Sequence, residues 1–381
     1  MHPRTIALRQ VPTLVFGPGA LALCRDHLVA LGATRILAIT SPSNRRYAEQ
    51  LLNTFPHSEI DDSIRAEPTV AIFQHTLTQA RAFAPDLIIG LGGGSPLDVA
   101  KLIAALTNST QRIEEAFGIG NLITRTLPLI CIPTTAGTGS EVSPNAILLD
   151  ESEQMKKGVI SPHLVPDATF IDPELMRTVP AHVTAATGLD ALTHCIEAYA
   201  NNFAHPMIDT WALDGIRKIS VSLATAVNEP NNLAAREQVA LGSLYGGLCL
   251  GPVNTAAVHA LSYPLGSRYH VPHGHANAIL MPHVCRFNLT AAPHRYRDIA
   301  LALGAREEDS DEATALAGVE KLWQLIRSTG LEMNLARLNI PAEDIPAMTT
   351  AGLNVTRLMK NNLRPLTQHD AEEIYRAAFN A

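Results

Sequence analysis

The hydrophobic and polar positions in the first 180 residues form two alternating kinds of segment. Short, almost continuous apolar runs have the length of buried strands. These runs occupy residues 35–40, 86–94, 128–135, 146–150 and 168–172. Among them, residues 45–55 and 69–83 carry apolar side chains at the spacing of amphipathic helices. Continuous apolar strands that alternate with amphipathic helices predict a parallel sheet covered on both faces.

Beyond Pro173 the pattern becomes mainly helical. Long segments with apolar residues every three or four positions predict helices. The clearest are residues 185–200, 206–227, 234–250 and 367–380. We therefore expect an α/β domain over residues 1–180 and an all-α domain over residues 181–381. The length of 381 residues also favours two domains, because one hydrophobic core rarely extends over so long a chain.

Composition and charge exclude several classes of protein. Hydrophobic residues make up 46% of the chain and charged residues 17%, which is typical of a folded globular protein and not of a disordered one. The net charge of −7 is spread without long runs of either sign, which argues against a nucleic-acid partner. The sequence contains neither an apolar run long enough to span a membrane nor the pattern of a secretory signal. Five scattered cysteines form no CxxC pair, so we expect a cytoplasmic protein without disulfides.

A glycine-rich turn ends the apolar run at 86–94 and leads into a helical pattern. It consists of Gly92, Gly93, Gly94 and Ser95, with Asp98 close behind. Glycines let backbone N–H groups approach an anion, and the dipole of the following helix attracts negative charge. The turn therefore predicts a pyrophosphate site. The alternative is a tight turn with a purely conformational role, in which Asp98 complements the helix N-terminus.

A second polar turn follows the run at 128–135 and includes Thr134, Thr135 and Thr138. Hydroxyls at the carboxyl end of a strand in an open α/β sheet are well placed to hold a ribose or a phosphate. The same residues are equally common in ordinary loops.

Histidines and one aspartate indicate a metal site in the second half of the chain. Asp190 and His194 are four residues apart in a helical pattern, so both side chains leave the same helix face. A second group places five of the 15 histidines close together: His259, His270, His273, His275 and His283. We expect Pro264 to end the helix that contains His259, and His273 to begin the next one. One aspartate and three histidines suit Fe²⁺ or Zn²⁺.

Five motifs occur in a characteristic order along essentially the whole chain. They are FGPGA at 16–20, GGGSPLDVAK at 92–101, PTTAGTGSE at 133–141, GLDALTHCIEAY at 188–199 and PLGSRYHVPHG at 264–274. Together they resemble the iron-containing (group III) alcohol dehydrogenase family, within the dehydroquinate synthase-like superfamily. The resemblance implies a dinucleotide-binding N-terminal domain, a helical metal-binding C-terminal domain and a homodimer. It also implies an enzyme that interconverts a small alcohol and its aldehyde or ketone, using NAD or NADP with Fe²⁺, or possible Zn²⁺ in its place.

The resemblance assigns roles to individual residues. The metal ligands would be Asp190, His194, His259 and His273. The pyrophosphate turn would be Gly92, Gly93, Gly94 and Ser95, with Asp98 nearby. Thr134, Thr135 and Thr138 would lie near ribose and nicotinamide, and Lys157 close to the cofactor.

Two positions depart from the family pattern. Many NAD-preferring relatives carry an Asp after the first strand, where this chain has Ser41, and an Asp there would repel the 2′-phosphate of NADP. NADP use is therefore plausible. Many alcohol-oxidising relatives carry a histidine where this chain has Tyr263, so Tyr263, His270 or a water chain would carry the proton. Arg268, with His270 and His275, hints at a polar or acidic substrate such as lactaldehyde, a hydroxy acid or maleylacetate.

Two other functions remain open on sequence grounds. A dehydroquinate synthase-like lyase would use NAD transiently with a metal, and it would need further Lys and Arg residues for a substrate phosphate. Arg268 is the one nearby candidate for such a residue. A non-catalytic metal or nucleotide sensor would bind the cofactor without turnover.

Overall fold

The computed structural model describes residues 5–65, 67–153 and 155–380. The chain divides into two compact units. The α/β unit comprises residues 8–135 and 139–177, and the helical unit contains residues 136–138 and the chain from Thr178 onward. The helical unit thus begins close to residue 180. It also includes the turn at 136–138, which we expected to belong to the α/β domain. A Cβ on Gly137 would lie 2.6 Å from the Cβ of Thr187, so this turn packs directly against the helix that contains Thr187.

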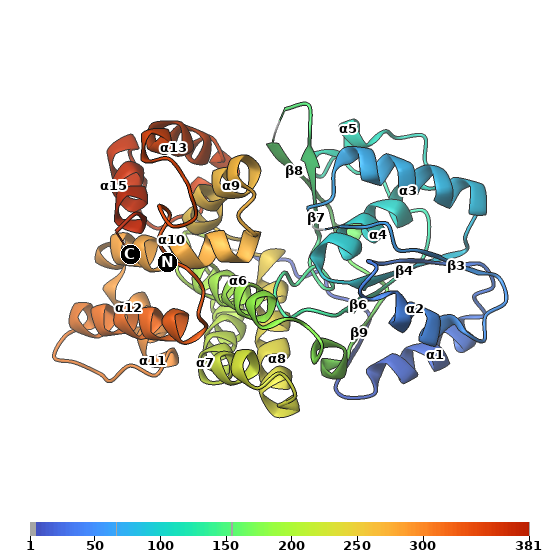
Figure 1. The fold of residues 1–381 in the computed structure, drawn as a ribbon, viewed down its shortest axis with the longest axis horizontal. Helices are drawn as coiled ribbons and strands as arrows, with labels where there is room; N and C mark the ends of the chain where they lie inside the picture. The colour runs from blue at the N-terminus through green and yellow to red at the C-terminus, as the bar shows by residue number, and fades with distance from the viewer. Residues whose placement is uncertain (1–4, 66, 154, 381) are drawn as a thin grey trace. The chain divides into compact units, whose positions relative to one another are not determined.

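The α/β unit contains a six-stranded parallel sheet in the order β1-β9-β6-β4-β2-β3 (Figure 1). Its strands are β1 (Thr13–Phe16), β2 (Ile36–Ile39), β3 (Ser58–Asp61), β4 (Leu87–Gly92), β6 (Leu129–Pro133) and β9 (Ala168–Ile171). Its helices are α1 (Ala20–Leu31), α2 (Arg45–Leu52), α3 (Val70–Phe83), α4 (Gly94–Leu106) and α5 (Ile113–Ala116). The predicted fold class, a parallel-sheet domain followed by a helical domain, is confirmed.

Both faces of this sheet are buried, which explains its continuous apolar strands. In β2, Leu37 and Ile39 pack in one core together with residues of α3 and α4. Their neighbours Ile36 and Ala38 pack in a second core together with residues of α1 and α2. Alternate residues of a strand point to opposite faces, so every position of β2 is apolar.

The run at 146–150 does not belong to the parallel sheet, contrary to our expectation. It forms β7 (Asn145–Asp150), which pairs antiparallel with β8 (Met155–Ile160) in a separate three-stranded sheet that also includes β5 (Gly118–Ile119). Buried and partly exposed residues alternate at the start of β7. A strand buried on one face only is typical of such a small antiparallel sheet.

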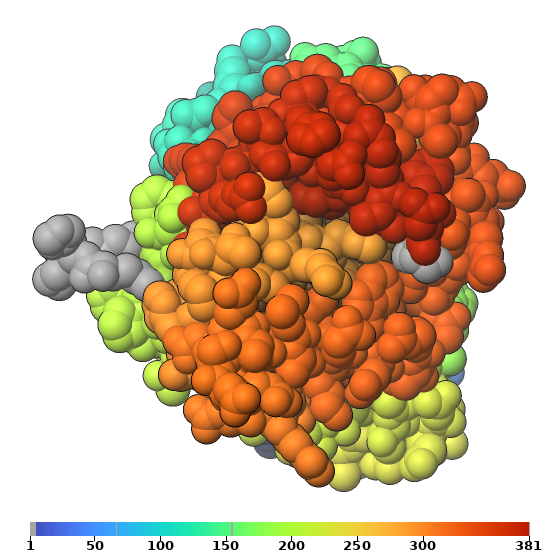
Figure 2. Space-filling view, turned by 90° about the vertical axis from the view of Figure 1, so that its left-hand side faces the viewer, coloured from blue at the N-terminus to red at the C-terminus, as the bar shows by residue number. Residues whose placement is uncertain are grey.

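The helical unit is built around α6 (Ala181–Tyr199), which is buried from Thr184 to Tyr199 except at Thr187. The other helices are α7 (Pro206–Asn228), α8 (Leu233–Leu250), α9 (Ala257–Tyr269), α10 (His273–Asn288), α11 (Pro293–Ala302), α12 (Asp311–Ser328), α13 (Ile345–Leu353), α14 (Thr356–Met359) and α15 (Gln368–Ala378). The C-terminal segments, orange and red in Figure 2, make up most of the face that this view shows. In the part of the chain that the structure describes, no helix has both the length and the apolar character needed to cross a membrane.

Close helix packing in this unit depends on glycines. A Cβ on Gly188 of α6 would lie 2.3 Å from the Leu223 side chain of α7, and one on Gly215 of α7 would lie 2.5 Å from the Cys195 sulfur. Both distances are too short for a larger residue.

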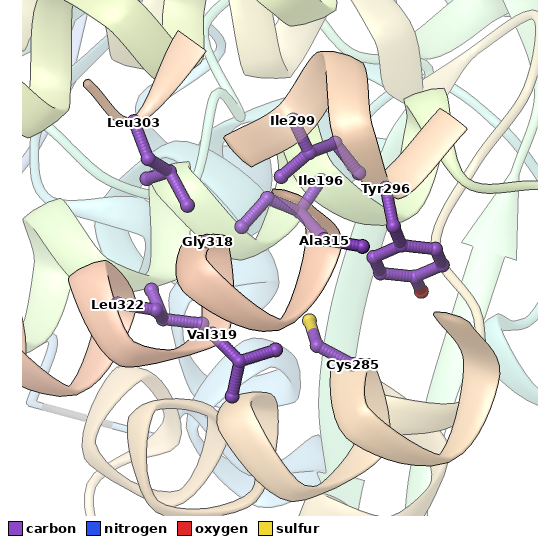
Figure 3. Close-up of a pocket in the computed structure, with 9 residues that line it drawn as sticks. All are labelled: Ile196, Cys285, Tyr296, Ile299, Leu303, Ala315, Gly318, Val319 and Leu322. Atoms are coloured by element: carbon purple, nitrogen blue, oxygen red, sulfur yellow. The ribbon is translucent and has the colours of Figure 1, made fainter. Parts of the chain in front are cut away.

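Figure 3 shows a pocket that lies among α6, α10, α11 and α12. Its lining is Ile196, Cys285, Tyr296, Ile299, Leu303, Ala315, Gly318, Val319 and Leu322. This mainly apolar lining belongs to the packed core.

Candidate metal centre and cofactor site

Helix α6 provides the first two candidate metal ligands. Asp190 and His194 are both buried, and His194 Nε2 lies 3.7 Å from Asp190 Oδ1. Their spacing of four residues places them one above the other on the same helix face, as the sequence predicted.

Helices α9 and α10 provide the other two. His259 Nε2 lies 3.5 Å from Asp190 Oδ1, and His273 Nε2 lies 3.7 Å from the same oxygen. The His259 and His273 rings are 5.2 Å apart, and the His194 ring stacks on His259 at 4.8 Å. The expectation that Pro264 ends the first of these helices is wrong, since α9 runs through Pro264 to Tyr269. A proline inside a helix removes one N–H donor, and Pro264 is buried within α9.

Asp190, His259 and His273 have the mutual spacing of ligands that share one ion, and His194 lies at a similar distance from Asp190. Four ligands about 2.1 Å from a tetrahedral metal lie about 3.4 Å from one another. The three imidazole nitrogens are 3.5–3.7 Å from one carboxylate oxygen, and the ligand atoms of Asp190, His259 and His273 all lie within 4.8 Å of one another. One carboxylate and three imidazoles suit Fe²⁺ or Zn²⁺. The residues therefore fit the ion that the motifs imply.

Glu197, one further turn along α6, contacts the His259 ring at Nδ1, the nitrogen that does not lie near Asp190. Its carboxylate oxygens accept hydrogen bonds from His259 Nδ1 and from the Val258 backbone N–H, each at 2.6 Å. Burial by itself would lower the pKa of His259, but the carboxylates of Glu197 and Asp190 raise it to about 10. A carboxylate on Nδ1 leaves Nε2 to face the metal position, which is a common arrangement around metal-bound histidines.

Asn277, one turn after His273, lies inside the ligand cluster and was missed by the sequence analysis. Its Nδ2 donates to Asp190 Oδ1 at 2.7 Å and lies 3.1 Å from His259 Nε2. Its Oδ1 is buried without a hydrogen-bond partner among the described residues. The four-residue spacing from His273 on α10 was the one sequence signal that could have found it.

Asp190 is a second buried carboxylate of the cluster. Burial would raise the pKa of its carboxyl, but His194, His273 and His259 hold that pKa well below its usual range. The carboxylate therefore stays ionised while buried. This is the form that binds a cation.

In the α/β unit, the predicted cofactor turns meet at the carboxyl ends of neighbouring strands. The chain passes from β2 outward to β3 and then returns to β4 on the other side of β2. Ligands of open α/β sheets bind at such a reversal. Thr40 Oγ1, at the end of β2, donates to the Leu91 carbonyl at 2.6 Å, and the Thr134 N–H donates to the Gly92 carbonyl at 2.9 Å.

The glycine turn itself requires glycine. Gly92 has a φ of 154°, and a Cβ there would lie 2.7 Å from the Pro96 ring. Gly93 precedes the first residue of α4, Gly94, and a Cβ on Gly93 would lie 3.3 Å from Thr135 Oγ1. The turn thus places backbone N–H groups and the Thr135 hydroxyl together at the N-terminus of a long helix. This is an anion-binding arrangement.

Asp98, in the first half of α4, forms hydrogen bonds to the segment that follows β6. Its carboxylate accepts a hydrogen bond of 2.5 Å from Ser140 Oγ and one of 2.9 Å from the Ile147 N–H. The buried Lys101 ammonium on the same helix donates to the carbonyls of Ser143 and Asn145 at 2.8 Å each. Both oxygens of Asp98 are occupied in this way, so Asp98 and Lys101 attach α4 to the segment from 140 to 147. Such contacts indicate a supporting role for Asp98.

Two family models match the chain. A model for iron-containing alcohol dehydrogenase matches residues 12–173, and a model for the C-terminal region of the Fe-containing alcohol dehydrogenase family matches residues 184–379. The chain belongs to the iron-containing alcohol dehydrogenase family. The expected enzyme class is thereby confirmed.

Known iron-containing alcohol dehydrogenases and related proteins match over nearly the whole chain. Long-chain-alcohol dehydrogenase 1 of Geobacillus thermodenitrificans is 36% identical over 97% of this chain and 97% of its own length. The crystal structure of a 1,3-propanediol oxidoreductase has a TM-score of 0.95 and 32% identity, covering 99% of this chain and all of that one. Sulfoacetaldehyde reductase from Bifidobacterium kashiwanohense, solved in complex with NAD⁺, has a TM-score of 0.90 and 26% identity, with full coverage of both chains.

The other predicted cofactor-binding residues are Ser41, Lys157 and Thr138, and each has different neighbours. Ser41 accepts a hydrogen bond of 2.9 Å from the Asn44 side chain at the start of α2. The Lys157 ammonium pairs with Asp150 and Glu153 at 2.8 and 2.7 Å, and Asp150 and Glu153 raise its pKa. Thr138 lies in the segment that packs with the helical unit.

Tyr263 and His270, the candidate proton carriers, differ in burial. The Tyr263 ring lies 6.1 Å from that of His273, and its hydroxyl accepts a hydrogen bond of 2.9 Å from Arg357. His270 is exposed, with a φ of 57° at the C-terminal end of α9. Arg268, the cation noted in the sequence, is exposed as well. Tyr263 is therefore the candidate that contacts the metal cluster.

Proposed function

We propose that this protein interconverts a small alcohol and its aldehyde or ketone with a nicotinamide cofactor and one divalent ion held by Asp190, His194, His259 and His273. The supporting observation is the convergence of three imidazole nitrogens on one ionised carboxylate oxygen. The bound ion would supply Lewis acidity toward the substrate oxygen.

Side chains and backbone groups of the protein would orient the metal ligands, bind the cofactor and transfer the proton. Glu197 holds the His259 ring so that Nε2 faces the metal position. Backbone N–H groups of the turn from Gly92 to Ser95 bind the pyrophosphate, while Thr134 and Thr135 lie toward the ribose and nicotinamide. Tyr263 holds or moves the proton of the substrate hydroxyl, since its ring contacts that of His273. His270 is exposed, so it would exchange protons only with solvent.

The cofactor in this proposal is NAD, with NADP also accepted. A related sulfoacetaldehyde reductase was solved with NAD⁺. The Ser41 side chain after β2 carries no charge that would repel a 2′-phosphate. Zn²⁺ remains the alternative ion, since the ligand set suits both metals. The homodimer stays a prediction, which light scattering of the purified protein checks.

The decisive experiment is anaerobic purification and metal analysis of the wild-type protein and His259→Ala, followed by NADH and NADPH oxidation on a panel of aldehydes. We expect about one ion per chain in the wild type, and loss of both the ion and most of the turnover in the variant. Cofactor oxidation should match the aldehyde added mole for mole, which a lyase with transient NAD chemistry would not show. An unchanged metal content and turnover in His259→Ala would refute the assignment.

A further inference from the structure

A cationic side chain lies beside the proposed metal centre. Arg357 belongs to the short helix α14, and its Nη2 donates a hydrogen bond of 2.9 Å to the Tyr263 hydroxyl. Tyr263 follows His259 by one turn of α9, and its ring is 6.1 Å from the ring of His273. A single phenol ring therefore separates the guanidinium from a metal ligand.

The guanidinium of Arg357 forms no ion pair with the residues that the structure describes. The side chain is half-buried, and within the described ranges no carboxylate lies within 4.0 Å of its nitrogens. Arg295 of the same unit, in contrast, pairs with Asp209 at 2.7 Å. A guanidinium that has lost part of its hydration is stabilised by an anion, and Tyr263 supplies only a neutral oxygen.

The chemistry of the guanidinium indicates which group would complete this site. Its planar N–H donors match the two oxygens of a carboxylate or a similar oxyanion, and such charge-assisted bonds are stronger than neutral ones. The Tyr263 hydroxyl occupies one donor and fixes the plane of the group. Within the described part of the chain, its other N–H donors have no hydrogen-bond partner.

We propose that Arg357 determines substrate specificity by binding the anionic end of a short aldehyde acid, a carboxylate or a sulfonate, while the aldehyde end reacts at the metal centre. This inference rests on the proposed function and narrows its substrate class. It assigns to Arg357 the role that the sequence had suggested for Arg268. Arg268 lies exposed on the last turn of α9.

The test compares matched substrates on the full-length, metal-loaded enzyme with NADH. Succinic semialdehyde and butanal have the same carbon number but differ in charge, and sulfoacetaldehyde and propanal test the sulfonate in the same way. Loss of a bond to a charged group lowers affinity about 10- to 100-fold. Loss of the hydrogen bond to Tyr263 affects charged and neutral aldehydes alike, so the ratio of the two is the readout. We expect Arg357→Gln to lower the ratio of kcat/KM for an anionic aldehyde to that for its neutral partner by that factor, mainly through KM of the anionic one.

Three further variants make the outcome specific. Arg357→Lys keeps the charge without the planar donors and should lose less than Arg357→Gln. Arg268→Gln tests the other cation, and Arg327→Gln, exposed near the end of α12, is the matched surface control. Equal losses for charged and neutral aldehydes in Arg357→Gln, or a larger loss of anionic preference in Arg268→Gln, would overturn the inference.

A binding measurement separates this inference from the proposed function. If the wild type reduces no aldehyde with either cofactor, the proposed function fails. Calorimetry with succinate, and with ethanesulfonate, then judges Arg357 independently. Binding by the wild type that Arg357→Gln weakens at least tenfold supports the anion site, and equal binding or none by both proteins refutes it.

Discussion

At the scale of single residues, the metal centre depends on side chains that hold its ligands as well as on the ligands themselves. Glu197 is buried against His259 and also accepts the Val258 N–H. A glutamate on a helix is an ordinary residue in sequence, and its spacing of three from His194 is compatible with many roles. The contact with His259 Nδ1 could be recognised only in three dimensions, because α9 is distant in sequence.

Replacing Glu197 by Gln should weaken metal binding by about 10- to 100-fold while preserving the fold. The amide oxygen can still accept one hydrogen bond, but the negative charge that orients His259 is lost. Competition with a chelator measures the affinity. Glu320→Gln, an exposed carboxylate of α12, is the control. A metal affinity equal to that of the wild type would show that the charge of Glu197 does not contribute to metal binding.

His283 provides a prediction of pH dependence away from the metal ligands. Its ring packs edge-on against Trp323, and burial, with Arg286 nearby, lowers its pKa from 6.5 to about 4. Between about pH 6.5 and pH 4, His283 is therefore protonated in the unfolded chain but neutral in the folded protein. Because the unfolded chain binds the extra proton, the free energy of unfolding decreases as the pH falls through this range. The loss is on the order of 2–3 kcal/mol.

Urea unfolding of the wild type and His283→Gln at pH 7 and pH 4.5 checks this. The variant should be less stable than the wild type by a smaller margin at pH 4.5 than at pH 7, or should even become the more stable of the two. A difference in unfolding free energy that does not change with pH would contradict the lowered pKa.

At the scale of helices and strands, close approach of α6 and α10 sets the spacing of the ligands. A Cβ on Gly274 would lie 2.2 Å from the Ala186 carbonyl oxygen and 3.0 Å from the Asp190 Cβ. His273, the adjacent residue, is therefore brought to Asp190 because glycine follows it. The sequence shows the glycine, but the helix that it contacts is visible only in the fold.

Gly274→Ala should separate α10 from α6 and so increase the distance between His273 and Asp190. We expect a loss of about 1–3 kcal/mol in unfolding free energy, typical of overpacking, together with weaker metal binding. Chemical unfolding and metal analysis measure the two effects. Ala276→Gly, a change of similar size in the same turn of α10, should lower stability without a comparable effect on the metal.

At the scale of the whole molecule, the two proposed ligands bind to different units. All four proposed metal ligands lie in the helical unit, and the glycine turn lies in the α/β unit. A ligand stabilises the structure that binds it, by about 2.7 kcal/mol at a concentration 100 times its Kd.

Hydrogen exchange should therefore show two patterns. Adding Fe²⁺ anaerobically to the metal-free protein should slow exchange chiefly in α6, α9 and α10, whereas NADH should slow it around the turn after β4 and the start of α4. His259→Ala serves as the control for the metal, since it should retain only the NADH effect. Protection of the α/β unit by metal alone would contradict this division.

The sequence by itself determined the fold class and most of the central strands of the parallel sheet, and it predicted the types of the metal ligands. Apolar periodicity and helical spacing are local properties, so the run at 36–39 and the pair Asp190 and His194 could be predicted directly. The pairing of β7 with β8 was not predicted, because an apolar run does not specify its partner strand.

Only the tertiary structure decided which distant side chains share one environment. It placed Asp98 on Ser140 and Ile147, Asn277 among the metal ligands, and Arg357 against Tyr263. These contacts join residues separated by 42 to 94 positions. Their formation depends on the packing of whole helices and strands, a cooperative property that no short segment of sequence contains.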